Sequence, residues 1–421
     1  MANTQLVANM HSGIYKSMLA SGKANPFLYS ADASAPNVSR QLYKINPNQQ
    51  LQAAATARTT LEFNVPKSGF LTGCYLRFGV TSANWGPSPG PGVGTKCAGS
   101  EAIEEVSIQA RGRPLRKSHD LALLWDAVAA DNAAERDNKL GCLGKAVFPA
   151  GGLGTGGRNF YVDVGKALGF NQASQLAFDT LFVEDLTISV TLRAVPDLFK
   201  GQATAVTYTG AHCYMDFSQL EAADYDVYRS EQYSASQPTK TLAMSWEKET
   251  TATIANAATV SRSDNIDIKQ KGLVHKTVFA LSNKTMSDAA SDRVSNSPIE
   301  GVKLYANGQI VYECDDVHVL SQMMSRGLVP DTDPGSGGID NALIAGENST
   351  FCIDYSQMQL PNGMQDKLTG ALNTNDLSSV YLDVTWTPAA ANSYFARVAH
   401  HAYVMQSIDG SSGFVSSSAR E

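Results

Sequence analysis

Apolar and polar residues alternate in short runs along most of this chain. The runs are rich in Val, Ile, Thr, Tyr and Phe, and segments rich in Gly and Pro separate them. Alternation of this kind over about four to eight residues is typical of β-strands that bury one face. The pattern therefore predicts an all-β chain.

The expected strands fall into two sets. The first set comprises residues 58–65, 69–80, 103–110, 113–117, 159–164, 184–193 and 204–216. The second set comprises residues 241–255, 264–268, 272–281, 299–306, 309–313, 350–355, 379–386 and 395–407. Connections of uneven and sometimes long size fit two tandem eight-stranded antiparallel jelly rolls, a double jelly roll, better than a tight up-and-down barrel.

The two sets repeat each other in sequence. The segment "IEEVSIQARGRPLRKSHDLALL" begins at Ile103, and "IEGVKLYANGQIVYECDDVHVL" begins at Ile299. Aligned without a gap, they share identical residues at Ile103/Ile299, Glu104/Glu300, Val106/Val302, Ala110/Ala306, Gly112/Gly308, Asp120/Asp316 and Leu124/Leu320. Further similar segments follow in the same order, and the period is far longer than that of solenoid or propeller repeats. The chain is therefore interpreted as a duplicated domain.

The duplication suggests a division of the chain into five parts. We expect an N-terminal arm at 1–50, a first jelly roll at 51–220, a linker at 221–240, a second jelly roll at 241–408 and a C-terminal tail at 409–421. The arm lies outside the repeat and is expected to dock on a neighbouring molecule or on lipid. The linker is polar and shows no periodicity.

Five residues of the repeated segments are expected to have structural roles. Asn307 and Gly308 form the dipeptide that favours a two-residue hairpin turn, and Gly112 occupies the matching position in the first copy. Asp120 and Asp316 each precede a short loop helix, where a carboxylate can accept hydrogen bonds from the first backbone N–H groups. A hairpin that leads into a capped helix is therefore expected in both copies.

Composition argues against several classes of function. The chain has 421 residues and a net charge of −7, and it contains no long run of basic residues. Proteins that bind nucleic acid directly usually present a basic stripe, so no such partner is expected. The six cysteines form no C-x-x-C pair and are expected to be free thiols in a reducing compartment. Neither a signal peptide nor a membrane-spanning segment is expected.

No catalytic set emerges from the sequence. Asp331, Asp333 and Asp340 lie among glycines and could hold a hard cation, but the order of an EF-hand is missing and a plain loop is the better interpretation. The seven histidines include no H-x-H pair and are interpreted as structural. No nucleophile has an evident base beside it. We therefore expect no catalytic residue, no cofactor and no bound metal.

The duplicated jelly rolls, with helices inside loops and an N-terminal arm, resemble the double jelly-roll major capsid proteins of tailless icosahedral viruses. That lineage includes bacteriophages with an internal membrane, adenovirus and large eukaryotic DNA viruses. The resemblance covers roughly residues 55–408, and its most specific local element is "VKLYANGQIVYE" at Val302–Glu313. At 421 residues, the chain is nearer in length to the compact bacteriophage members.

The resemblance implies a structural protein of the virion capsid, assembled in the host cytoplasm. Such proteins form homotrimers of pseudo-hexagonal outline that tile an icosahedral shell. The implied partners are other copies of the chain, neighbouring capsomers, minor capsid or vertex proteins and, through the arm, an internal lipid membrane. The loops at 82–100 and 328–349 are candidates for outward towers or contacts between subunits.

Two other classes of function remain as alternatives. A tandem jelly-roll spike that binds carbohydrate or a receptor would present an exposed aromatic platform. A duplicated, bicupin-like enzyme would hold a metal or a carboxylate pair in one of its barrels.

Overall fold

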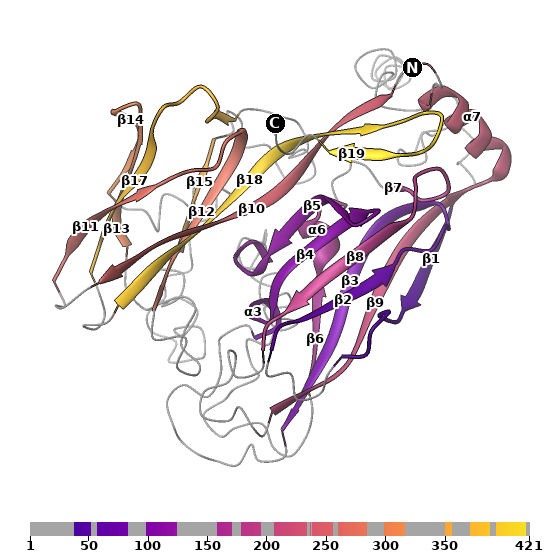
Figure 1. The fold of residues 1–421 in the computed structure, drawn as a ribbon, viewed down its shortest axis with the longest axis horizontal. Helices are drawn as coiled ribbons and strands as arrows, with labels where there is room; N and C mark the ends of the chain where they lie inside the picture. Colours follow the sequence, from indigo (N-terminus) through magenta and orange to yellow (C-terminus); the bar gives the residue numbers. More distant parts are fainter. Residues whose placement is uncertain are drawn as a thin grey trace, which may run out of the picture.

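The structure is a computed structural model of the whole chain. It describes residues 38–51, 57–82, 98–123, 158–170, 178–194, 206–233, 236, 238–255, 260–283, 299–315, 350–355, 371–387 and 393–417. Within this part, the chain forms two rolls of antiparallel strands that lie side by side (Figure 1).

The first roll consists of two facing sheets. Its strands are β1 (Val38–Ile45), β2 (Thr59–Asn64), β3 (Phe70–Ser82), β4 (Ile103–Ala110), β5 (Arg113–His119), β6 (Arg158–Asp163), β7 (Phe178–Asp179), β8 (Leu186–Leu192) and β9 (Val206–Leu220). One sheet has the order β1-β9-β3-β6, with β7 added beside β3, and the other has the order β2-β8-β4-β5.

The second roll repeats this plan. Its strands are β10 (Thr239–Ala255), β11 (Arg262–Asp267), β12 (Leu273–Asn283), β13 (Ile299–Ala306), β14 (Gln309–Cys314), β15 (Thr350–Asp354), β16 (Leu372–Asn373), β17 (Val380–Trp386), β18 (Ser393–Ile408) and β19 (Val415–Ser417). The sheet orders are β10-β18-β12-β15 and β11-β17-β13-β14. Each strand order of the first roll therefore has a counterpart in the second, and two jelly rolls are confirmed.

Each roll encloses its own apolar core between its sheets. In β17, every second residue from Val380 to Trp386 is buried, as expected of a strand with one face toward a core. Phe63, Phe78 and Phe217 are fully buried in the first core. Burial of aromatic side chains of this size is a leading stabilising contribution in a β-sandwich.

The two copies share their hairpin turns. The turn between β4 and β5 places Arg111 at φ 48° and Gly112 at φ 74°. The turn between β13 and β14 places Asn307 at φ 50° and Gly308 at φ 79°. Two consecutive positive φ angles are required by the tight turn that matches the twist of antiparallel strands. Gly112 and Gly308 therefore lie at matching positions of positive φ in the two copies.

The copies also share an irregularity in strand pairing. The β4–β5 register shifts between Ile108 and Gln109, and the β13–β14 register shifts between Leu304 and Tyr305. These pairs occupy matching positions of the gapless sequence alignment. A bulge preserved in both copies supports duplication of one ancestral domain.

The first strand of the first roll lies within the segment expected to be an arm. Residues 38–45 form β1, which pairs along its full length with β9. Its alternation is obscured in the sequence because Leu42 faces outward and is 59% exposed, while Tyr43 and Ile45 pack against the core. The first roll therefore begins at least as early as residue 38.

The segment expected to be an aperiodic linker contains a helix, α7 (Ala222–Gln232). None of its residues is buried, so it has no apolar stripe that would reveal it in the sequence. Asp224 in its first turn and Arg229 in its last turn match the polarity of the helix dipole. Two shorter helices, α3 (Ala98–Glu101) and α6 (Val164–Ala167), lie within loops of the first roll.

Cys74, Cys213, Cys314 and Cys352 are buried free thiols, as expected. Within the described part of the chain, no helix is both long and apolar enough to cross a membrane.

Candidate functional site: the junction between the two rolls

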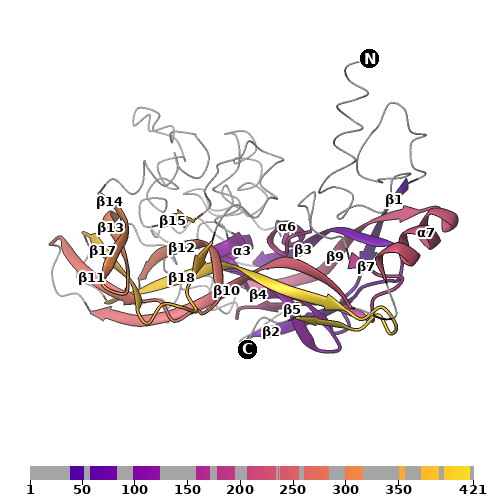
Figure 2. The same ribbon diagram turned by 90° about the horizontal axis from the view of Figure 1, so that it is seen from above.

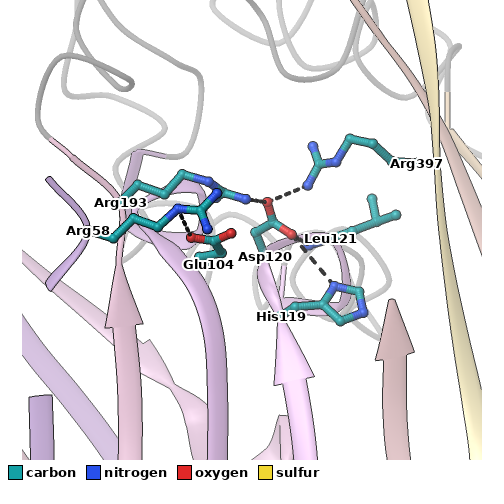
Figure 3. A network of polar contacts seen from close by, with 7 residues as sticks. All are labelled: Arg58, Glu104, His119, Asp120, Leu121, Arg193 and Arg397. Carbon is teal, nitrogen blue, oxygen red and sulfur yellow. Dashed lines mark hydrogen bonds and ion pairs between the residues drawn. The ribbon is translucent and has the colours of Figure 1, made fainter. Parts of the chain in front are cut away.

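Buried polar side chains of both rolls meet at the junction between the rolls. Figure 3 shows its centre, where the end of β5, the end of β8 and the strand β18 converge. Figures 1 and 2 show β10 and β18 extending from the second roll toward the first, where they approach β5. This ribbon is the frame on which residues of both rolls meet.

Asp120 is the central residue of the junction and is completely buried. Its Oδ2 atom lies 2.5 Å from Nη2 of Arg193 in the first roll and 2.5 Å from Nη2 of Arg397 in the second. Its Oδ1 atom accepts a hydrogen bond of 2.8 Å from the backbone N–H of Leu121, and Nδ1 of His119 lies 3.6 Å away. One carboxylate therefore joins two guanidinium groups that come from different rolls.

This result refines the role expected of Asp120. Residues 120–123 are helical, so the aspartate stands at the start of a helix as expected. It contacts the backbone N–H of the next residue, but its second oxygen is used for ion pairing rather than for capping. Buried ion pairs of this kind depend on all their partners, because removal of one leaves a charge without compensation.

Apolar contacts surround the ion pairs. A buried cluster joins two residues of the first roll, which follow Asp120, to residues of the second roll. Its members are Leu121, Ala122, Trp246, Val278, Ala280, Cys352 and Ala399. The cluster is separate from the cores of the two rolls and belongs to the contact between them.

Histidine and tryptophan rings extend this contact. The rings of Trp246 and His401 stack with a centroid distance of 4.4 Å, and His119 lies edge-on to Trp246 at 6.4 Å. Burial lowers the pKa of His401 well below its ordinary value, and the nearby His275 and Lys276 lower it further. The ring is therefore a neutral part of the packing, which agrees with the structural role expected of the histidines.

Arg116 on β5 forms a second link between the rolls. It is almost fully buried, lies over the ring of Phe178 at 4.6 Å, and donates hydrogen bonds to the Leu168 carbonyl and to Oε1 of Gln406 on β18. Gln406 in turn donates to the carbonyl of Leu115. Burial lowers the pKa of Arg116 to about 9.

The open edge of β5 is also covered by the second roll. The backbone N–H of Lys117 donates a 2.9 Å hydrogen bond to Oγ of Ser245 on β10. An edge strand has N–H groups without a strand partner, and such edges are usually covered or blocked. Here the same chain supplies the cover.

The C-terminal hairpin completes the junction. The Gly413 carbonyl accepts a hydrogen bond from the Glu184 N–H, and Arg111 lies over the ring of Phe414 at 5.8 Å. Val415 on β19 is buried within the core of the first roll. Part of the segment expected to be a tail therefore packs as structure on the opposite roll.

The contacts at the junction hold the first roll to the second. Its charged groups are buried in mutual ion pairs and hydrogen bonds, and its rings pack against one another. Among the described residues, no group of three His, Cys, Asp or Glu side chains could hold a metal ion. What the junction provides is a fixed relationship between the two rolls.

The other residues expected to be structural have different outcomes. Asn307 lies in the turn between β13 and β14 with a positive φ, and its Oδ1 also accepts hydrogen bonds from the backbone N–H groups of Ser378 and Ser379. Asp316 lies outside the described residues, as do the weak cation candidates Asp331, Asp333 and Asp340. The loop helix expected after Asp316 lies outside them as well.

Arg193 and Arg397 were not anticipated from the sequence. Each follows or lies within an alternating strand, where an isolated arginine is normally read as an outward-facing residue. Only their burial, at 6% exposure each, reveals that they are internal. The one signal in the sequence was the aspartate repeated at the same place in both copies.

Comparison with solved structures supports the architecture. A PBCV-1 virus capsid structure aligns with a TM-score of 0.68 and 14% identity, covering 94% of this chain and 100% of that chain. The chain has the double jelly-roll fold. The Faustovirus major capsid protein aligns with a TM-score of 0.59 and 10% identity, over 90% of this chain and 92% of its own. The mavirus major capsid protein aligns with a TM-score of 0.51 and 13% identity, over 89% of each chain.

Sequence comparison adds nothing to this result. No protein-family model and no curated protein sequence matches the chain. The fold is therefore shared with viral capsid proteins at a level of identity that reveals three-dimensional structure alone.

Proposed function

We propose that the chain is a viral major capsid protein that builds the shell of an icosahedral virion. The observation that carries this proposal is the agreement of the whole double jelly roll with a PBCV-1 virus capsid structure, over 94% of this chain and 100% of that one. Agreement across both rolls and their connection is more specific than the presence of a jelly roll, since single jelly rolls serve many functions.

The junction supports a structural role. Two rolls held together by buried ion pairs, an apolar cluster and a C-terminal hairpin that packs on the first roll behave as one block. A block with two similar halves can occupy two similar positions in a ring. Three copies would then present six similar units, which is the pseudo-hexagonal homotrimer expected from the sequence.

The further partners belong to the same proposal. In a shell, the trimer would contact neighbouring capsomers and minor capsid or vertex proteins. An internal membrane contacted by the N-terminal arm, and a bacteriophage as the source, are finer proposals. The membrane contact rests on the sequence between positions 6 and 18, where the spacing of the apolar residues would place them on one face of a helix. The bacteriophage source rests on the resemblance stated from the sequence.

The test is the mass and outline of the purified full-length chain. Light scattering coupled to size-exclusion chromatography should give three times the chain mass of 44.9 kDa. Negative-stain images should show particles of hexagonal outline. A stable monomer that binds a glycan or turns over a substrate would instead favour the spike or the enzyme alternative.

A further inference from the structure

The two rolls differ in how the matching parts of their surfaces are covered. In the first roll, the β5 edge meets β10 of the second roll. In the second roll, the matching edge strand is β14, which lies on the far side of the molecule from the first roll (Figure 1). Within the described residues, the first roll is therefore covered at a position where the second is open.

One matched pair of residues shows the difference directly. Leu115 on β5 and Val311 on β14 occupy the same place in the gapless alignment. Leu115 is 2% exposed, whereas Val311 is 53% exposed and its neighbour Ile310 is 47% exposed. An apolar pair exposed on an edge strand is a feature that soluble proteins normally avoid unless another chain covers it.

On the sheets that contain β1 and β10 the difference is reversed, because here the second roll is the one that is covered. The outward residues Val278, Ala280 and Ala399 of the second roll are fully buried, because Leu121 and Ala122 of the first roll pack on them.

The matching outward face of the first roll carries exposed side chains among the described residues. Phe160 and Val162 point into the core, so Tyr161 between them points outward, where it is 48% exposed. On β1, Leu42 is 59% exposed for the same reason.

The composition of this outward face suits a protein partner. Tyr75, Tyr161 and Tyr214 share it with Arg77 and Lys44 by strand alternation and pairing. Tyrosine and arginine are enriched at the centres of protein interfaces. Beside the apolar pair of β14, Asp315 is exposed, and the exposed Glu313 forms an ion pair with Lys303 on β13.

We propose that the outward face of the β1-β9-β3-β6 sheet in one copy binds the β14 edge of a second copy. Within the chain, the β5 edge of the first roll and the residues that follow it pack on the second roll. The proposed contact would repeat this arrangement between copies, with β14 in place of β5 and the first roll of the other copy in place of the second roll. It joins different surfaces on the two partners, and such a contact forms a closed ring when the rotation between neighbouring copies closes, as a rotation of one third of a turn does in a trimer. The inference rests on the proposed trimer and identifies the surfaces that form it.

The first test uses a matched pair of substitutions in the full-length chain. Val311→Glu places a charge on the β14 edge, and Val227→Glu places the same charge on α7, where Val227 is also 53% exposed. We expect V311E, and L42E on the opposite surface, to weaken trimer association at least about tenfold, as for a central interface residue. The V227E chain should associate as the wild type does.

The second test reports the contact itself. A photo-crosslinking phenylalanine analogue at position 311 should form intermolecular products, and mass spectrometry should place their attachment within residues 38–45, 70–82, 158–163 or 206–220. Circular dichroism confirms that each variant is folded. A trimer that V311E leaves intact, or whose crosslinks lie elsewhere, would overturn this contact while the capsid proposal stands. A wild-type chain that is monomeric at all concentrations would overturn both.

Discussion

Asp120 in the first roll and Arg397 in the second form a buried ion pair, with 2.5 Å between Oδ2 and Nη2. The same oxygen contacts Arg193, so the carboxylate offsets positive charge from both rolls. Since none of these side chains is more than slightly exposed, water cannot replace a lost partner. The pair is therefore expected to determine how tightly the rolls are coupled.

Substitution of this carboxylate should destabilise the chain strongly. D120N keeps the shape of the side chain but leaves two buried guanidinium groups without their anion, which costs about 3–5 kcal/mol in comparable sites. Chemical denaturation followed by fluorescence would measure the loss. The control is D185N, because Asp185 pairs with Lys67 at the surface, where ion pairs contribute little. Equal effects of the two substitutions would contradict a special role for Asp120.

The two hairpin turns should respond alike to loss of their glycines. A Cβ at Gly112 or Gly308 would meet no atom within 4 Å, so the cost of alanine there is that of a positive φ alone. We expect G112A and G308A each to lower the free energy of unfolding by about 1–2 kcal/mol. The two losses should add in the double variant, because the turns lie in different rolls. A loss at only one turn would argue against their equivalence.

Gly413 should be more sensitive than either turn glycine. It has φ 69°, and a Cβ there would overlap the carbonyl group of Phe182 in the first roll. G413A should therefore release the C-terminal hairpin from that roll and expose Val415 of its core. Hydrogen exchange should show faster exchange at 415–417 and at Glu184, whose N–H bonds to the Gly413 carbonyl. Unchanged protection at these amides would show that the hairpin docks in another way.

Stability should decrease in mild acid because of His401. Its pKa is lowered by burial in the folded chain, whereas the unfolded chain has the ordinary value of about 6.5. Above that pH the ring is neutral in both states and contributes no pH dependence. Below it, the unfolded state binds a proton that the folded state does not, so the free energy of unfolding falls as the pH falls.

The measurement compares melting temperature across pH for the wild type and H401F. Phenylalanine preserves a ring that can stack on Trp246 but cannot take a proton. The H401F profile should be flatter than that of the wild type between about pH 7 and pH 5. Parallel profiles would assign the acid sensitivity to other groups.

Local patterns were sufficient to predict most strands and both hairpin turns. Val302–Ala306 and its copy alternate cleanly, and the turn residues Asn307 and Gly308 have few alternative conformations. The strand β1 was missed because outward-facing Leu42 breaks its alternation. Periodicity identifies a strand that has one apolar face and one polar face. It fails for a strand such as β1, whose outward face also carries an apolar residue.

The junction could not be predicted because it depends on distant parts of the chain. Asp120 and Arg397 are brought together only when both rolls have formed and β18 extends across to β5. Nothing near Arg397 in the sequence marks it as buried. The repeated aspartate was visible, but its partners are a property of the packed rolls.

The most direct test of the account is a cryo-electron microscopy structure of the purified oligomer. We predict a trimer in which each chain keeps the Asp120–Arg397 contact and the β14 edge of one copy lies on the outward face of the β1-β9-β3-β6 sheet of the next. The six rolls would then form a ring of pseudo-hexagonal outline. A monomer, or an oligomer whose rolls do not alternate around one axis, would contradict the central claim that this chain is a capsid building block.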